Sequence, residues 1–139
     1  MAQVGLLEDN VRIARLCATM LQYAGHQVTI YDHALECLQA LLPPTETSSQ
    51  ATSLQPPLLP IDVLILDLHL PDVDGLDVLR RLQAHSLTQR LPLIFCTAAA
   101  LSEVELALTI APHASVIEKP FTFKDLTSAV INVLPSATK

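Results

Sequence analysis

The chain has 139 residues, enough for one compact domain but too few for a kinase, a two-lobed enzyme or a domain joined to a separate effector. Half of the residues are hydrophobic, which excludes disorder over most of the length, yet no apolar run reaches the roughly 18 residues of a membrane span. A net charge of −6 and the absence of tryptophan argue against nucleic-acid binding, which depends on clustered cations or on stacking platforms.

Apolar periodicity predicts two strand–helix pairs before residue 43. The strands are expected at 3–7 and 27–31, and the helices at 11–24 and 33–42. Gly25 is typical of a residue that ends a helix, and Asp32 is the expected N-cap of the second helix.

Three further strand–helix pairs are predicted after residue 60. The strands are expected at 63–66, 91–96 and 114–117, and the helices open at 74–75, at 103 and at 122. Ser102 is the expected cap of the second of these helices, which would end at Ala111 because Pro112 stops it. The last helix would run to Leu134.

The five predicted strands alternate with five predicted helices. This order implies parallel pairing with right-handed crossovers. The strands are nearly continuous runs of Val, Ile and Leu, which is typical of a sheet covered on both faces. We therefore predict one α/β domain over 1–139: a doubly wound, flavodoxin-like sheet of five parallel strands with five helices.

Residues 43–60 interrupt this pattern. They hold five of the ten prolines and six Ser or Thr residues, a composition that predicts a loop. The simplest interpretation is a surface insertion in the domain. Because a loop from a helix to the next strand lies opposite the carboxyl ends of the strands, we do not expect it to cover a site at those ends.

Polar residues stand at the carboxyl ends of four predicted strands. Glu8 and Asp9 follow the first strand, Asp67 the third, Thr97 the fourth and Lys119 the fifth. Ligands of doubly wound sheets bind at this edge. We therefore expect three carboxylates, one hydroxyl and one ammonium group to converge there.

This set of side chains favours phosphoryl chemistry. Three neighbouring carboxylates repel one another unless a cation lies among them, and oxygen ligands that leave room for water suit Mg²⁺. Mg²⁺ with a nearby lysine and hydroxyl is the equipment for phosphoryl transfer, in which Asp67 is the natural nucleophile. Taken singly, an acid after a strand can equally be a helix cap or a solvated loop residue. The combination at four strand ends is what favours a site.

At these residues the chain closely resembles the response-regulator receiver domain of two-component systems, of the stand-alone chemotaxis type. The matching segments are residues 8–9, 64–75, 95–98 and 118–121. The Asp-x-x-Leu-Pro-x-x-Asp-Gly string from Asp67 and the later Lys-Pro-Phe are specific signals. The resemblance covers essentially the whole chain apart from 43–60 and the last few residues.

The resemblance implies a phosphoprotein in which Asp67 accepts a phosphoryl group from a sensor histidine kinase or a phosphotransfer protein. It also implies that Mg²⁺ is bound by Asp9, Asp67 and the main-chain carbonyl of His69, with Glu8 acting through a water. Such a protein is not an enzyme in the usual sense, because it catalyses only its own phosphorylation and slow autodephosphorylation. It signals by phosphorylation-dependent binding of a downstream protein.

The resemblance also assigns the two remaining polar residues. Thr97 would hydrogen-bond the phosphoryl group and move on activation, and Lys119 would pair with the phosphoryl oxygens. Three positions before the lysine the family usually has Tyr or Phe, whereas this chain has Val116. The aromatic part of the usual switch is therefore missing.

Two other functions stay open from the sequence. One is a receiver-like interaction scaffold that is never phosphorylated. The other is a phosphatase of the haloacid-dehalogenase type, which would need a second Asp where this chain has His69. Turnover of phosphate esters without a kinase would favour the phosphatase, and failure to take up a phosphoryl group would favour the scaffold.

The predicted helices at 103–111 and 122–134 contain more apolar residues than one sheet-facing stripe requires. The surplus indicates an exposed apolar patch over these helices and the strand at 114–117, of the kind that marks interaction sites. We expect a homodimer or a partner helix there, with Val116 exposed or half-buried. The alternative is that both helices are simply well buried.

The location can also be predicted. Three cysteines at scattered positions form neither a disulfide pattern nor a zinc pattern. The first residues lack the basic region and the long apolar stretch of a signal peptide. We therefore expect a cytoplasmic protein with reduced thiols.

Overall fold

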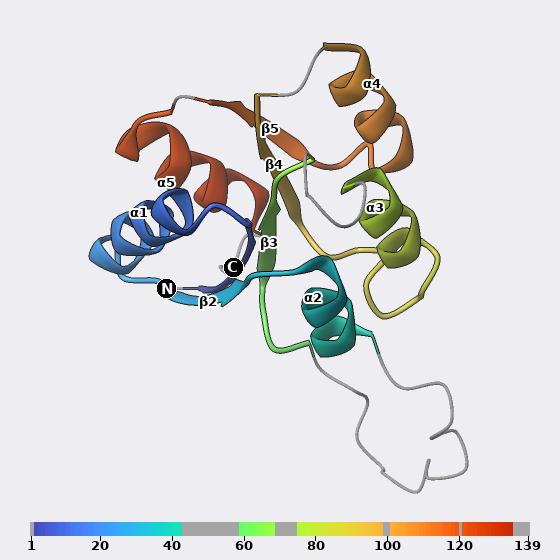
Figure 1. The fold of residues 1–139 in the computed structure, drawn as a ribbon, viewed down its shortest axis with the longest axis horizontal. Helices are drawn as coiled ribbons and strands as arrows, with labels where there is room; N and C mark the ends of the chain where they lie inside the picture. The colour runs from blue at the N-terminus through green and yellow to red at the C-terminus, as the bar shows by residue number, and fades with distance from the viewer. Residues whose placement is uncertain (1, 43–58, 69–74, 99–100, 120, 135–139) are drawn as a thin grey trace, which may run out of the picture.

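The computed structural model describes residues 2–42, 59–68, 75–98, 101–119 and 121–134. In these residues five parallel strands form one sheet in the order β2-β1-β3-β4-β5, and five helices pack against it (Figure 1). The strands are β1 (Gln3–Leu7), β2 (Gln27–Tyr31), β3 (Val63–Leu66), β4 (Leu93–Thr97) and β5 (Ser115–Glu118). The helices are α1 (Val11–Tyr23), α2 (Ala34–Leu41), α3 (Gly75–Gln83), α4 (Leu101–Ile110) and α5 (Phe123–Val133). This confirms the predicted doubly wound, flavodoxin-like fold.

The helices form two layers, one on each face of the sheet. Helices α1 and α5 cover one face and α2, α3 and α4 cover the other (Figure 1). Each face has its own buried cluster of side chains, because successive residues of a strand point to opposite faces. Leu64 and Leu66 of β3 therefore contribute to one cluster, and Val63 and Ile65 to the other.

The continuous apolar runs are explained by this arrangement. All residues of β3 and β4 are buried, since each of these strands has a neighbour on both sides and helices on both faces.

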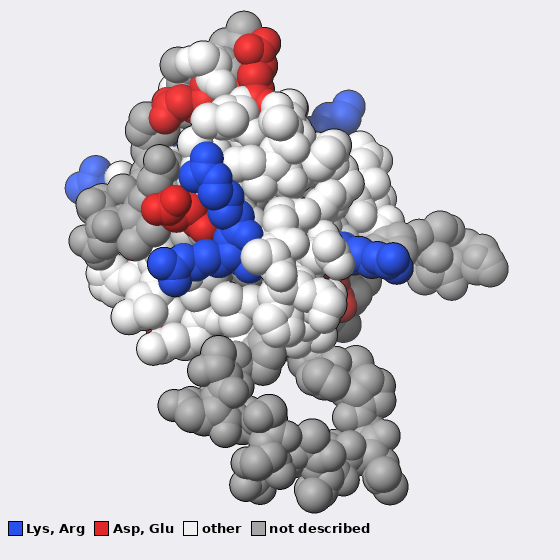
Figure 2. Space-filling view, turned by 90° about the vertical axis from the view of Figure 1, so that its right-hand side faces the viewer, with Lys and Arg blue, Asp and Glu red and all other residues white. Residues whose placement is uncertain are grey.

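The outer surface on the side of α2, α3 and α4 has few charged side chains, of both signs and in small separate groups (Figure 2). No helix in the described part of the chain has the length and apolar character needed to cross a bilayer.

Local residues mark the ends of α1 and the start of α5, and of these signals Gly25 was predicted. The Asn10 side chain accepts the Ile13 N–H at 3.1 Å and begins α1, and Gly25 follows its end with φ of 98°, a conformation that glycine adopts without strain. Thr122 and Asp125 exchange reciprocal hydrogen bonds of 3.0 Å at the start of α5. Local polar side chains therefore set these boundaries.

Other predicted boundaries were wrong by one or two residues. His33, not Asp32, is the N-cap of α2, and it makes no side-chain capping bond. The carboxylate at this end comes from inside the helix: Glu36 accepts the Asp32 N–H at 3.1 Å and so satisfies a backbone donor before the first turn. Likewise α4 begins at Leu101, which places Ser102 inside its first turn rather than at its cap.

The observed boundaries of two strands also differ from the predicted ones. Strand β4 begins at Leu93 instead of 91 and includes Thr97, and β5 lies one residue later than predicted. In both cases the apolar run and the hydrogen-bonded ladder do not coincide, because the neighbouring strand sets where pairing starts. Most of the predicted insertion at 43–60, namely 43–58, lies outside the described residues.

His26 gives the fold a pH-dependent contact. Its side chain is buried, and its Nδ1 accepts the backbone N–H of Ala2 at 3.0 Å. Burial lowers the pKa of His26 below its ordinary value of 6.5. Folding therefore favours the neutral form of the His26 ring.

We expect the free energy of unfolding to contain a His26 contribution that is fully present above pH 6.5 and is lost as the pH falls from there toward the lower folded pKa. His26→Asn places an amide oxygen near the position of Nδ1 and does not titrate. Urea unfolding across this range should therefore show a smaller acid loss for His26→Asn than for the wild type. Gln22→Asn, at an exposed position of α1 with no titratable group, is the control and should show the pH dependence of the wild type. Equal pH profiles for all three proteins would contradict the assignment.

Candidate functional site

Lys119 joins two of the carboxylates at the carboxyl ends of the strands. Its Nζ donates hydrogen bonds to Glu8 Oε1 at 3.0 Å and to Asp67 Oδ2 at 2.9 Å. Glu8 and Asp67 are buried, and the Lys119 side chain is 17% exposed. Three elements that are distant in sequence, the ends of β1, β3 and β5, are thus brought to one point.

The register of the sheet explains this convergence. Leu7 of β1 pairs with Leu66 of β3, so the acids that follow them, Glu8 and Asp67, leave the sheet side by side. The backbone N–H of Asp67 donates to Leu7 O at 3.2 Å. On the other side of the site, the Lys119 N–H donates to Thr97 O at 3.1 Å.

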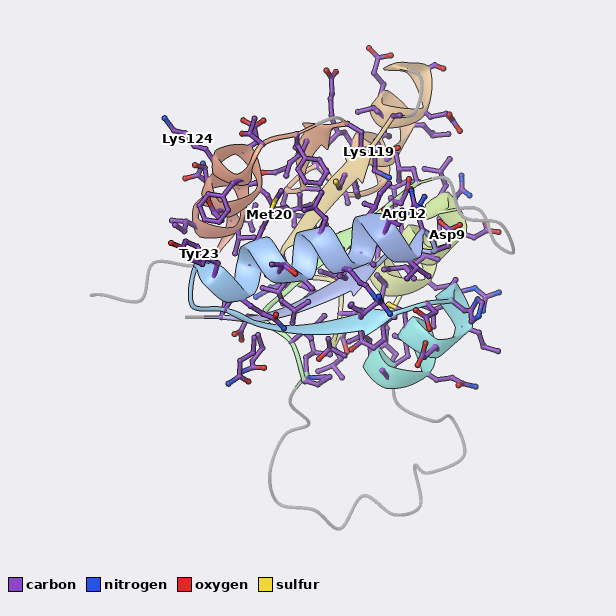
Figure 3. The ribbon with its side chains drawn as sticks, turned by 60° about the vertical axis from the view of Figure 1, so that its left-hand side comes forward. Asp9, Arg12, Met20, Tyr23, Lys119 and Lys124 are labelled. Carbon is purple, nitrogen blue, oxygen red and sulfur yellow. The ribbon has the colours of Figure 1, made fainter. Side chains whose placement is uncertain are left out.

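The three predicted acids form one cluster. One carboxylate oxygen from each of Glu8, Asp9 and Asp67 lies within 4.8 Å of the others. Asp9 is exposed, unlike the other two, and lies with Lys119 near the N-terminal end of α1 (Figure 3). An all-oxygen donor set with one side open to solvent fits Mg²⁺, which retains several waters when bound.

The pKa values of the buried pair reflect a balance of burial and hydrogen bonding. Burial raises the pKa of Glu8, although the Lys119 ammonium and the Asn10 N–H, at 3.2 Å from Oε2, act in the opposite direction. For Lys119, burial alone would lower the pKa, but the hydrogen bonds to Asp67 and Glu8 outweigh it and raise the pKa. Lys119 therefore stays charged between its two partners.

Thr97 and Gly75 complete the described surroundings. Thr97 is the last residue of β4 and is 1% exposed. A Cβ on Gly75 would lie 2.6 Å from the Cα of Leu68, and the Gly75 N–H donates to Leu68 O at 3.1 Å. Leu68 thus lies so close to the start of α3 that only glycine fits at position 75.

The structure brings Glu8, Asp9, Asp67 and Lys119 together, with Thr97 at the adjoining strand end. The predicted ligand His69 lies outside the described residues, as does Pro120. Sequence reasoning missed Asn10, which serves both the site and the helix: its N–H donates to Glu8 and its side chain caps α1. An Asn directly before an apolar helical pattern is an N-cap signal that could have found it.

The chain matches the model of a known family. A model described as the response regulator receiver domain matches residues 4–131, which is most of the chain. The chain belongs to the response regulator receiver domain family. As a receiver it is part of two-component signalling, and its family is not one of classical enzymes.

The receiver is similar to curated response regulators. It is 29% identical to the response regulator SaeR of Staphylococcus epidermidis over 140 aligned positions, which cover 100% of this chain and 53% of that protein. Identity to SaeR of Staphylococcus aureus is 26% with the same coverage. The chain therefore spans about half the length of the curated relatives it matches.

Solved structures show the same fold. The chemotaxis protein CheY4 of Vibrio cholerae superimposes with a TM-score of 0.74 at 22% identity, covering 96% of this chain and 99% of that one. A response regulator receiver domain protein from Clostridium thermocellum gives 0.73 at 23% identity, covering 96% and 94%. At these identities the likeness establishes the architecture of the receiver.

Replacing Lys119 by Met should strongly destabilise the receiver at neutral pH in the presence of a chelator. The change leaves Glu8 and Asp67 buried as uncompensated charges, and breaking such a pair costs about 3 kcal/mol. Adding Glu8→Gln to the Lys119→Met protein should restore part of the loss, since it removes one of the two charges. Urea unfolding measures both free energies.

The matched control is Lys124→Met, which removes an exposed lysine of α5 and should change the free energy of unfolding by no more than about 0.5 kcal/mol. Equal losses for Lys119→Met and Lys124→Met would contradict a stabilising role for the Lys119 contacts.

Proposed function

We propose that Asp67 of this receiver accepts a phosphoryl group from a sensor histidine kinase or a phosphotransfer protein. The supporting observation is the position of its carboxylate, buried at the end of the central strand β3 and 2.9 Å from the Lys119 ammonium. A carboxylate oxygen attacks phosphorus, the P–N bond of the phosphohistidine breaks, and the histidine leaves as neutral imidazole after taking up a proton.

The acidic cluster supports a role for Mg²⁺ in this transfer. Asp9, Asp67 and the main-chain oxygen of His69 would hold the ion, with Glu8 acting through a water. When bound, Mg²⁺ supplies positive charge that offsets the charge of the transferred phosphoryl oxygens. The exposed position of Asp9 leaves that side of the cluster accessible to an ion and its waters.

The chain's own residues then have distinct roles. Lys119 exchanges a carboxylate partner for a phosphoryl oxygen, and remains charged because its pKa is raised. Thr97, at the end of β4, donates its hydroxyl to the phosphoryl group and moves toward it. The receiver turns over no other substrate and signals by binding a downstream protein when phosphorylated.

We further propose that residues 1–139 act as one receiver unit that signals by binding a partner, with 43–60 as an insertion in it. The phosphoryl transfer to Asp67 would take place in the cytoplasm. The three cysteines support a reducing compartment, since all are buried as free thiols.

Incubation with acetyl phosphate or phosphoramidate and Mg²⁺ should add the mass of one phosphoryl group to the wild-type receiver, and Asp67→Asn should abolish the gain. The physical reason is that the amide lacks the nucleophilic carboxylate oxygen. Intact-mass spectrometry measures the result. A chelator should reduce the gain as strongly as Asp9→Asn does, because both remove the ion from the cluster.

The exposed Asp77→Asn of α3 is the matched control and should be phosphorylated like the wild type. A mass gain that survives in Asp67→Asn would show that the phosphoacceptor is elsewhere. No gain in any variant would favour the non-phosphorylated scaffold.

We propose the surface of α4, β5 and α5 as the output face, binding a second copy of the receiver. A groove of about 900 Å³ runs along β5 and α5, and the half-buried Val116 contributes to its lining. The large apolar side chains exposed on the flanking helices include Leu106 of α4 by 44% and Ile131 of α5 by 64%. Exposed apolar surface next to a groove is typical of an interface.

Beryllofluoride, which mimics the phosphoryl group, should promote dimerisation of the wild type, and Val116→Glu and Leu106→Glu should each raise the dissociation constant by about tenfold or more, equivalent to about 1.4 kcal/mol. The introduced charges would be desolvated at the interface. Sedimentation measures the association. Leu35→Glu, at a 63% exposed position of α2, is the control and should leave it unchanged. Monomers under every condition would contradict the dimer.

A further inference from the structure

Two of the three cysteines lie together beside the carboxylate site. Cys17 stands on the buried face of α1 and Cys96 is the residue before Thr97 in β4. Both belong to the buried cluster between the sheet and the α1–α5 layer, with exposures of 1% and 2%. A hydrogen bond joins the two side chains.

We propose that Cys17 and Cys96 form an oxidative modification site, in which a small hydroperoxide converts the two thiols into a disulfide that ties α1 to β4 next to the phosphoacceptor. The third cysteine offers an internal comparison. Cys37 lies on α2 in the other buried cluster, on the opposite face of the sheet, and cannot reach this pair.

The two thiols differ in a way that suits an attacking and a resolving cysteine. The hydrogen bond with Cys96 lowers the pKa of Cys17, and the nearby Lys119 ammonium acts in the same direction. The same hydrogen bond and burial raise the pKa of Cys96. Burial raises the pKa of Cys37 to about 12, so this thiol is inert by comparison. We assign Cys17 as the attacking thiol because it lies one helical turn after Ile13, which lines the cavity described below.

The chemistry balances with the hydroperoxide as the only oxidant. The Cys17 sulfur attacks one peroxide oxygen, the O–O bond breaks, and hydroxide leaves and takes a proton to become water. The resulting sulfenic acid is attacked by the Cys96 sulfur, the S–O bond breaks, and a second water leaves. Two thiols and one hydrogen peroxide thus give one disulfide and two waters.

A cavity lies close to this pair of thiols. A cavity of about 320 Å³ is lined by Ile13, Leu16, Lys119 and Phe121. Ile13 lies one helical turn before Cys17, and the charge of Lys119 acts on both thiols. The thiols themselves do not line the cavity, so the hydroperoxide has to pass from it into the buried layer between α1 and the sheet.

Disulfide formation should reach the phosphoacceptor site through β4. The bond requires the two sulfurs to approach to about 2.05 Å, which draws α1 and the end of β4 toward each other. Thr97 follows Cys96 directly, and its carbonyl accepts the Lys119 N–H. Oxidation therefore constrains two of the residues that would contact a phosphoryl group; this step rests on the phosphorylation proposed above.

The test is treatment of the reduced receiver with hydrogen peroxide, followed by intact-mass measurement and peptide mapping without reductant. Wild type and Cys37→Ala should lose two hydrogen atoms and yield one cross-linked peptide pair containing Cys17 and Cys96, reversed by dithiothreitol. Cys17→Ala and Cys96→Ala should not form that link. Cys17→Ser and Cys96→Ser, checked by circular dichroism, repeat the measurement for any variant that fails to fold.

Three results would overturn the proposal: a disulfide that includes Cys37, disulfides only between molecules, or thiols that stay reduced while methionines are oxidised. A second arm measures phosphorylation by acetyl phosphate before and after oxidation. The rate should fall severalfold in oxidised Cys37→Ala and be unchanged by peroxide in Cys96→Ala. Equal rates would overturn the coupling. A reduced protein that takes up no phosphoryl group would instead refute the proposed function and leave the disulfide result intact.

Discussion

The contacts of Lys119 with Glu8 and Asp67 are the interaction on which the rest of the site depends. They join the ends of β5, β1 and β3 in one buried group of charges. An ammonium that is taken out of water needs partners, and so do two carboxylates. Each residue thus makes burial of the others tolerable. The same balance explains why the Lys119 pKa rises despite burial.

The backbone fixes where these charges stand. Parallel pairing places Glu8 beside Asp67, and main-chain hydrogen bonds anchor Asp67 to β1 and Lys119 to β4. Side chains on paired strand ends are held more precisely than side chains on long loops. Asp9 differs because it is exposed, next to the Asn10 cap of α1. The cluster therefore has a rigid, buried side and one side open to solvent, which is where a metal ion or a phosphodonor can approach.

Much of this could be predicted from the sequence, and the reasons are specific. Unbroken apolar runs identified the buried strands, and a residue that ends such a strand must lie at the sheet edge, so Asp67 and Lys119 could be placed together. The cap at Asp32 was mispredicted by one residue: the helix begins after His33, and the carboxylate that serves this end is Glu36, which accepts the Asp32 N–H from inside the helix. The Cys17–Cys96 contact has no sequence signature, since it depends on which layer each side chain enters.

Strand β4 connects the site to the proposed output face of α4, β5 and α5. Thr97 pairs in register with Glu118, and Phe95 pairs with Val116, so any displacement of the β4 end is transmitted to β5 across hydrogen-bonded neighbours. A valine at 116 has no aromatic ring that could swing between two positions. Coupling through the β4–β5 ladder needs no such ring, because packed strands shift together. A disulfide at Cys96 would constrain the same strand. Oxidation would therefore oppose the displacement of β4 that follows phosphorylation.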